Sequence, residues 1–138
     1  MKVNPSISLR FNGQCEAAFQ FYQQCLGARP GMALTWGASP MAQDAPPEWS
    51  GKILYAALTL GDTEIVGGDV LPEHYQAPRG FAIMLDMSDP PNAERIFNSL
   101  AENGKVGMPL QPTFWAARYG SVTDRFGIPW EINCGNPA

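Results

Sequence analysis

The sequence is short of the residues on which many catalytic centres depend. It has one histidine in 138 residues, and only 16% of its residues are charged. A single histidine excludes a metal site built from several histidines and leaves little room for a Ser-His-Asp triad, whose GxSxG segment is also absent. No P-loop occurs, and no glycine-rich loop follows a predicted strand, so we expect no cofactor.

Basic clusters and long apolar runs are lacking as well. The formal net charge is −4 and the lysines and arginines are scattered, which argues against nucleic acid as a partner. No apolar run approaches the about 18–20 residues that a membrane span needs, and the first residues lack the apolar core of a secretory signal. We therefore expect a cytoplasmic protein without nucleic-acid or membrane partners.

Cysteine is sparse. Cys15, Cys25 and Cys134 are an odd number without a CxxC spacing, which argues against a disulfide framework and fits reduced thiols in the cytoplasm. Cys15 and Cys25 also fall on one helical apolar stripe, so we interpret both as packing residues.

Two helical patterns alternate with strand-like segments along the chain. Apolar residues at three- and four-residue spacing predict helices over residues 15–26 and 90–103, the first ended by Gly27 and the second capped by Asn92 and ended at Asn103-Gly104. Strands are predicted at residues 1–10, 32–36, 53–60, 63–68, 81–87, 105–110, 116–123 and 128–133.

Each half of the chain therefore has the order strand, helix, three strands. An internal duplication of a βαβββ unit explains this order, with modules at about residues 3–70 and 79–134 inside a single domain of residues 1–138. The alternative is an ordinary α+β domain whose halves are alike by chance. We favour the duplicated α+β fold.

A family resemblance supports the duplication. Residues 7–22 (ISLRFNGQCEAAFQFY) with LGA at 26–28, and residues 113–133 (TFWAARYGSVTDRFGIPWEIN), resemble the PhnB-like branch of the glyoxalase/bleomycin resistance, or vicinal oxygen chelate, superfamily. The resemblance implies two βαβββ modules that form curved mixed sheets around a cleft, in a homodimer that binds a small molecule. Some relatives are named demethylubiquinone methyltransferases, an activity for which the sequence has no cofactor loop.

The resemblance also implies where a divalent metal ion would be held. Enzymes of this superfamily use His, Glu or Gln on four strands, and these positions fall on Ile7 or Ser8, on Val66 or Gly67, on Phe81 and on Glu131. Only Glu131 is a typical ligand, whereas a catalytic ion needs about three or four protein ligands. We therefore expect no metal, the alternative being a set of relocated ligands: His74, Asp69 and Glu131.

Glu131 is the candidate catalytic residue. If its side chain points to the concave side of the module, it would act as a general base or bind a polar ligand. The alternative is a carboxylate held by Arg118 or Arg125, or simply solvated. His74 is interpreted as a solvated loop residue, with a ligand contact as the alternative.

Aromatic residues crowd the segment that contains Glu131. They are candidates for core or dimer packing, whereas Trp115 and Tyr119 are also candidates for lining a cleft. The predicted ligand-binding residues are Ser8, Trp36, Tyr55, Asp69, Phe81, Phe114, Trp115 and Tyr119.

Two aspartates and three arginines are candidates for ligand contacts or for ordinary structural roles. Asp69 follows Gly67-Gly68, where bare backbone permits close approach of a ligand, but it would also serve as a turn carboxylate. Asp124 is predicted to fix the turn at Phe126-Gly127. An anionic ligand would be met by Arg10, Arg79 or Arg118, but each would also be an ordinary surface charge, and we favour the surface charge for each of them.

These observations leave three hypotheses open. The first is a metal-independent lyase or isomerase that uses Glu131 as its base. The second is a non-catalytic protein that sequesters a ligand, as drug-resistance proteins of this fold do. The third is a divalent-metal enzyme with non-standard ligands, so whether the protein is an enzyme stays open.

Overall fold

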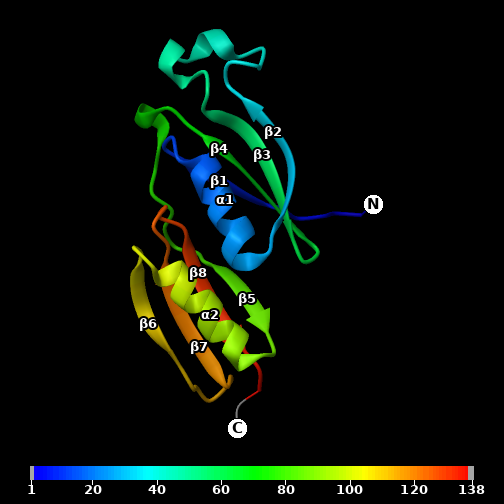
Figure 1. Cartoon of the computed structure of the whole chain (residues 1–138), viewed down its shortest axis with the longest axis vertical. Helices are drawn as coiled ribbons and strands as arrows, with labels where there is room; N and C mark the ends of the chain where they lie inside the picture. The colour runs from blue at the N-terminus through cyan, green and yellow to red at the C-terminus, as the bar shows by residue number, and fades with distance from the viewer. Residues whose placement is uncertain (1, 137–138) are drawn as a thin grey trace. The chain divides into compact units, whose positions relative to one another are not determined.

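The computed structural model describes residues 2–136 and divides the chain into two compact units, Met1–Gln76 and Ala77–Ala138 (Figure 1). Each unit is described by itself. Within residues 2–136, each has one four-stranded sheet and one α-helix.

The first unit is a βαβββ module. Its sheet has the strand order β1-β4-β3-β2, in which β1 and β4 are parallel and the other pairs are antiparallel. Three short 3-10 turns lie in the segments that follow β2 and β4. The elements are β1 (Ile7–Phe11), α1 (Cys15–Leu26), β2 (Arg29–Thr35), η1 (Ala42–Asp44), η2 (Pro47–Trp49), β3 (Ile53–Leu60), β4 (Thr63–Asp69) and η3 (Pro72–His74).

The second unit repeats this topology. Its strand order is β5-β8-β7-β6, again with one parallel pair, β5 and β8. The elements are β5 (Ile83–Met87), α2 (Pro90–Ala101), β6 (Lys105–Gln111), β7 (Arg118–Thr123) and β8 (Pro129–Cys134). The predicted α+β fold of two βαβββ modules is confirmed, while the cleft and the assignment to one domain stay predictions.

Each helix covers one face of its own sheet with an apolar stripe (Figure 1). α1 ends at Gly27, whose φ of 70° is the left-handed conformation that glycine adopts without strain. α2 begins at Pro90, as predicted, but its N-cap residue is Asp89 and not the predicted Asn92, whose side chain accepts hydrogen bonds from Arg95 instead. The buried stripes are Cys15, Ala18, Phe19, Tyr22 and Cys25 in α1, and Ala93, Ile96, Phe97 and Leu100 in α2.

The strand boundaries differ from the predictions where pairing ends. β1 begins at Ile7, the first residue that pairs with β4, so residues 2–6 are not in the predicted strand. β2 extends back through Pro30, which is tolerated because β2 is an edge strand and needs no ladder N–H on its outer side. β5 begins at Ile83 and therefore leaves Phe81 outside the strand.

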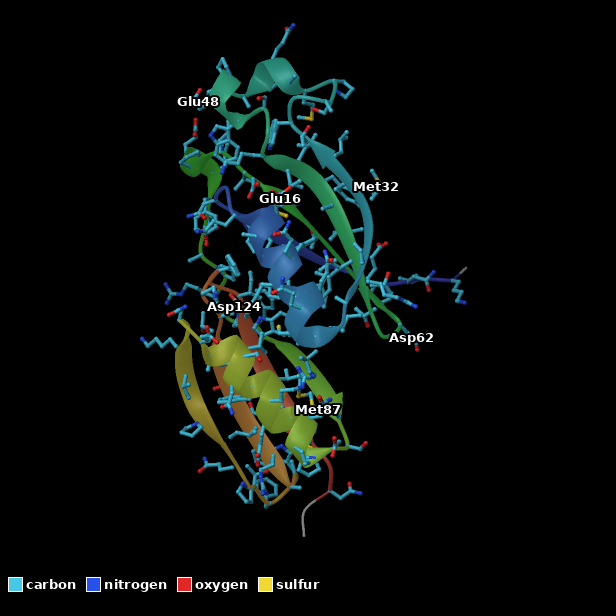
Figure 2. All side chains as sticks on the ribbon, viewed as in Figure 1. Glu16, Met32, Glu48, Asp62, Met87 and Asp124 are labelled. Atoms are coloured by element: carbon cyan, nitrogen blue, oxygen red, sulfur yellow. The ribbon has the colours of Figure 1, made fainter. Side chains whose placement is uncertain are left out.

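Two aspartates show how turns and connections are fixed. Asp62 lies exposed at the tip of the β3–β4 hairpin, whereas Asp124 is buried between β7 and β8 (Figure 2). The Asp124 Oδ1 atom accepts hydrogen bonds from the backbone N–H groups of Phe126, at 2.8 Å, and Ile128, at 3.1 Å. The predicted turn role of Asp124 is thereby confirmed.

Neither α1 nor α2, each of 12 residues, is long and apolar enough to cross a membrane, and the described residues contain no other helix that is.

Candidate functional site

The second module presents Glu131 on the sheet face that α2 leaves uncovered. Alternate residues of β8, Trp130, Ile132 and Cys134, are fully buried, whereas Glu131 and Asn133 between them are half-buried. Successive side chains of a strand point to opposite faces. Glu131 and Asn133 therefore lie on the opposite side of the sheet from the helix, which we call the open face of the module.

The strand registers define equivalent positions on the two open faces. In the second module Glu131 pairs with Met84 on β5 and Ser121 on β7, and in the first module Val66 pairs with Ser8 on β1 and Ala57 on β3. The adjacent row contains Asp86, Asn133 and Tyr119 in the second module and Arg10 and Gly68 in the first, where Tyr55 lies one residue before Ala56, the partner of Gly67.

These registers test whether a divalent ion fits the four positions that the superfamily uses. The pairs are Ser8 with Val66 and Met84 with Glu131, so only Glu131 offers a strong oxygen or nitrogen ligand. Met84, not the predicted Phe81, is the β5 residue beside Glu131, because Phe81 precedes the strand. The donor set at these positions does not fit a catalytic divalent ion.

The residues of the relocated ligand set are not arranged for an ion within either module. His74 lies exposed in η3, and among residues 2–136 no group of three His, Cys, Asp or Glu side chains is placed to hold an ion. The Asp69 carboxylate is occupied by backbone donors: Oδ1 accepts from the N–H groups of Gly13 and Cys15, both at 2.9 Å, and Oδ2 from that of Ile53, at 3.1 Å.

Glu131 forms a hydrogen-bonded pair with Tyr119 across two neighbouring strands. The Tyr119 hydroxyl donates to the Glu131 carboxylate. Burial raises the pKa of the Tyr119 phenol above 10.0, and the hydrogen bond to Glu131 and its negative charge raise it further. The two arginines proposed as partners of Glu131 pair elsewhere: Arg118 lies 3.7 Å from Glu94 and Arg125 lies 3.8 Å from Glu102.

Two further side-chain hydrogen bonds lie on the same open face. The Trp115 Nε1–H group donates to Asn133 Oδ1 at 3.1 Å, and Asn133 Nδ2 donates to Asp86 Oδ1 at 2.9 Å. These bonds fix the orientation of the Trp115 indole. Phe114 extends the cluster of rings, with its centroid 4.7 Å from that of Trp115, which is 5.1 Å from that of Tyr119.

The first module has a pocket of about 300 Å³ on its open face. Four predicted ligand-binding residues line it: Ser8, Trp36, Tyr55 and Asp69. Trp36 is held in the wall because its Nε1–H group donates to the backbone oxygen of Asp69 at 3.0 Å. The other lining residues are Arg10, Leu54, Val66, Gly67, Gly68 and Val70.

The structure thus brings the predicted residues together in two groups, one in each module. Ser8, Trp36, Tyr55 and Asp69 share the pocket of the first module. Phe114, Trp115, Tyr119 and Glu131 share the ring and hydrogen-bond cluster of the second. Phe81 joins neither group by any described contact, and the ligand-binding roles of all eight residues stay predictions.

Sequence reasoning missed three residues of these faces. Met84, Asp86 and Asn133 reach the open face only through the strand registers. The available signal was the alternation within each strand, which fixes the face of Asn133 once that of Glu131 is known.

Comparisons with known proteins agree with this architecture. A family model described as 3-demethylubiquinone-9 3-methyltransferase matches residues 3–133. Protein YjdN of Escherichia coli (strain K12) is 36% identical over 141 residues, covering 96% of this chain and 95% of that protein. Protein PA1353 from Pseudomonas aeruginosa has a crystal structure with a TM-score of 0.88 at 41% identity, covering 97% of this chain and 98% of that one.

A more distant structure shares the fold alone. It is a glyoxalase/bleomycin resistance protein/dioxygenase family enzyme from Burkholderia phytofirmans PsJN, with a TM-score of 0.65 at 12% identity, covering 94% of this chain and 95% of that one.

Proposed function

Because the chain belongs to the 3-demethylubiquinone-9 3-methyltransferase family, a PhnB-like branch of the glyoxalase-like superfamily, we propose that it binds a small organic molecule on the open face of its second module. The observation that carries the proposal is the Tyr119–Glu131 hydrogen bond beside exposed aromatic rings. This hydrogen bond places a proton acceptor, Glu131, and a proton donor, Tyr119, next to apolar ring surface.

The proposed chemistry is metal-independent proton transfer, as in a lyase or isomerase. Glu131 takes a proton from a carbon next to a carbonyl group of the ligand. The electrons of the broken C–H bond form the C=C bond of an enolate, and the negative charge moves to the carbonyl oxygen. The Tyr119 hydroxyl is protonated at neutral pH, because its pKa lies above 10.0. Once Glu131 has taken up the proton and lost its charge, this hydroxyl turns from Glu131 and donates to the enolate oxygen. Where the deprotonated carbon carries a hydroxyl group, Glu131 returns its proton to the former carbonyl carbon and the hydroxyl proton moves to the former carbonyl oxygen, so that a new carbonyl group forms at the deprotonated carbon and the isomerisation is complete.

Proton exchange in heavy water tests this proposal. Pyruvate, acetone and dihydroxyacetone serve as probes, with a chelator present, and NMR follows deuterium at the carbon next to the carbonyl. We expect enzyme-dependent exchange of at least one probe, a loss of about 100-fold or more in Glu131→Gln, and a smaller loss in Tyr119→Phe. Glu64→Gln, an exposed carboxylate on β4, is the matched control and should leave the exchange unchanged. Equal exchange in Glu131→Gln and the unaltered protein would disprove the role of Glu131.

The second candidate is a non-catalytic protein that sequesters its ligand. Phe114 and Trp115 favour it, because their side chains are 88% and 44% exposed while their rings contact each other edge to face. A planar apolar ligand would cover both rings and remove their surface from water. Saturable binding of such a ligand, without exchange and without an effect of Glu131→Gln, would select this function over proton transfer.

We also propose a cytoplasmic homodimer. The edge strands of the two sheets support association, because Met32 on β2 and Val106 and Met108 on β6 expose 59%, 43% and 38% of their surface. Analytical ultracentrifugation measures the mass directly. A monomer at all concentrations tested would contradict the dimer.

A further inference from the structure

We propose that the pocket of the first module takes a small organic carboxylate through Arg10 and Ser8. This site goes beyond the proposed function, because it lies on the other module and does not use Glu131. The argument rests on the charges, the floor and the walls of the pocket.

Two charged residues line the pocket, and only one of them has its charge available. The carboxylate oxygens of Asp69 are occupied by three backbone N–H groups, and the residue is 2% exposed. Arg10 bonds only to neutral oxygens, donating from Nη1 to Ser8 Oγ at 2.5 Å and to the Leu9 carbonyl at 3.3 Å. No carboxylate within residues 2–136 forms an ion pair with it. The pocket therefore presents an uncompensated guanidinium.

Comparison of the modules shows that this cation is specific to the first. Arg10 occupies the position that Asp86 has in the second module, so the charge is reversed. Gly68 occupies the position of Asn133, the side chain that satisfies Asp86. In the first module the cation Arg10 therefore has no side chain beside it at the Gly68 position. In the second module the anion Asp86 accepts a hydrogen bond from Asn133.

The floor of the pocket has no room for a side chain. A Cβ atom at Gly68 would overlap the carbonyl oxygen of Leu54, so this position holds bare backbone. Gly68 therefore contributes only backbone to the lining of the pocket, beside its strand partner Arg10.

The walls define the class of ligand. Five lining side chains are aromatic or aliphatic, and the volume of about 300 Å³ lies at the small end of the range for ligand pockets. One guanidinium balances one negative charge, and its planar fork matches the two oxygens of a carboxylate. The favoured ligand is a small monoanion with an apolar body. The apolar walls are Trp36, Leu54, Tyr55, Val66 and Val70.

Benzoate, benzamide and phenyl phosphate test the proposal on the full chain. Binding is followed by tryptophan fluorescence and by the NMR shifts of the Gly67 and Gly68 amides, which report on this pocket. We expect benzoate to bind saturably, to shift both glycines, and to weaken as salt is added. The neutral benzamide and the dianionic phenyl phosphate should both bind more weakly than benzoate.

Four variants separate the outcomes. Arg10→Gln should weaken benzoate binding by about 10- to 100-fold, and Ser8→Ala by less, because a charge-assisted bond is lost in the first. Arg29→Gln, an exposed arginine at the start of β2, is the matched control and should bind normally. Glu131→Gln should also bind normally, so failure of the proposed chemistry leaves this result unchanged. Equal affinity for benzoate and benzamide, tighter binding of phenyl phosphate, or normal binding in Arg10→Gln would each overturn the proposal.

Discussion

Tyr55 and Tyr119 occupy equivalent positions in the two modules. Each lies on the third strand of its unit, one residue before the residue that pairs with Gly67 in the first module or with Ile132 in the second. Their surroundings have diverged. Tyr119 bonds to Glu131, whereas the residue equivalent to Glu131 beside Tyr55 is Val66. The two modules therefore share the ring, whereas only the second has the acid.

The first prediction concerns the acidity of Tyr119. Glu131→Gln removes the negative charge beside the phenol, so the pKa of Tyr119 should fall but stay above 10.0, because burial remains the larger cause of its shift. The phenolate absorbance of each protein, after subtraction of the same titration in Tyr119→Phe, measures this pKa. Glu64→Gln should leave the titration unchanged. A pKa that is unaltered in Glu131→Gln would show that the hydrogen bond does not form in solution.

The order of elements could be predicted from the sequence, whereas the open faces could not. Apolar periodicity locates both helices and the closing strands because burial against one face imposes it. The register of one strand against another produces no comparable periodicity in the sequence. A shift of the register by one residue moves every side chain of the strand to the other face of the sheet. For this reason the sequence predicts Phe81 at the position beside Glu131, where the structure has Met84.

The second prediction is that Asp69 is a major contributor to stability. Its carboxylate joins the segment before α1 to the start of β3 by accepting three backbone N–H groups in a buried position. Asp69→Asn replaces one acceptor oxygen by a donor and should lower the free energy of unfolding by about 2–4 kcal/mol. Urea unfolding measures the change. Asp62→Asn, at the exposed tip of the β3–β4 hairpin, should change it by less than about 0.5 kcal/mol. Similar effects of the two substitutions would contradict the structural role.

The third prediction concerns alkaline pH. Burial, followed by the charges of Asp69 and Glu16, raises the pKa of the Cys15 thiol from 9.0 to about 12. Above pH 9.0 the unfolded chain loses the Cys15 proton while the folded protein keeps it. The free energy of unfolding is therefore unaffected by the ionisation of this thiol below pH 9.0 and decreases as the pH rises toward 12. One proton contributes a slope of up to about 1.4 kcal/mol per pH unit.

Urea unfolding of Cys15→Ala over this pH range checks the slope. The variant should be less stable at neutral pH, because Cys15 is fully buried, but its stability should decline less steeply with pH. Ala18→Gly, a change at another fully buried position of α1, should lower stability by an amount that does not depend on pH. Parallel curves for Cys15→Ala and the unaltered protein would refute the assignment.

The fourth prediction separates two aromatic residues that the sequence places in one cluster. Trp130 is fully buried and its Nε1–H group donates to Asp124 Oδ2 at 2.8 Å, whereas Phe114 is 88% exposed. Trp130→Phe should lower the free energy of unfolding by about 1–3 kcal/mol, because it removes a buried hydrogen bond and part of the packed ring. Phe114→Ala should change it by less than about 0.5 kcal/mol.

For ligand binding, Phe114→Ala should have the larger effect and Trp130→Phe the smaller, which is the reverse of their effects on stability. Phe114→Ala should weaken the binding of planar apolar ligands such as naphthalene derivatives, because the exposed ring extends the Trp115 surface that such a ligand would cover. Trp130→Phe, on the face of the sheet that α2 covers, should bind them normally at temperatures where it remains folded. Fluorescence titration of each variant makes the comparison. If Phe114→Ala instead destabilises the protein as much as Trp130→Phe, then the Phe114 ring is buried in the protein in solution and is not a ligand-binding surface.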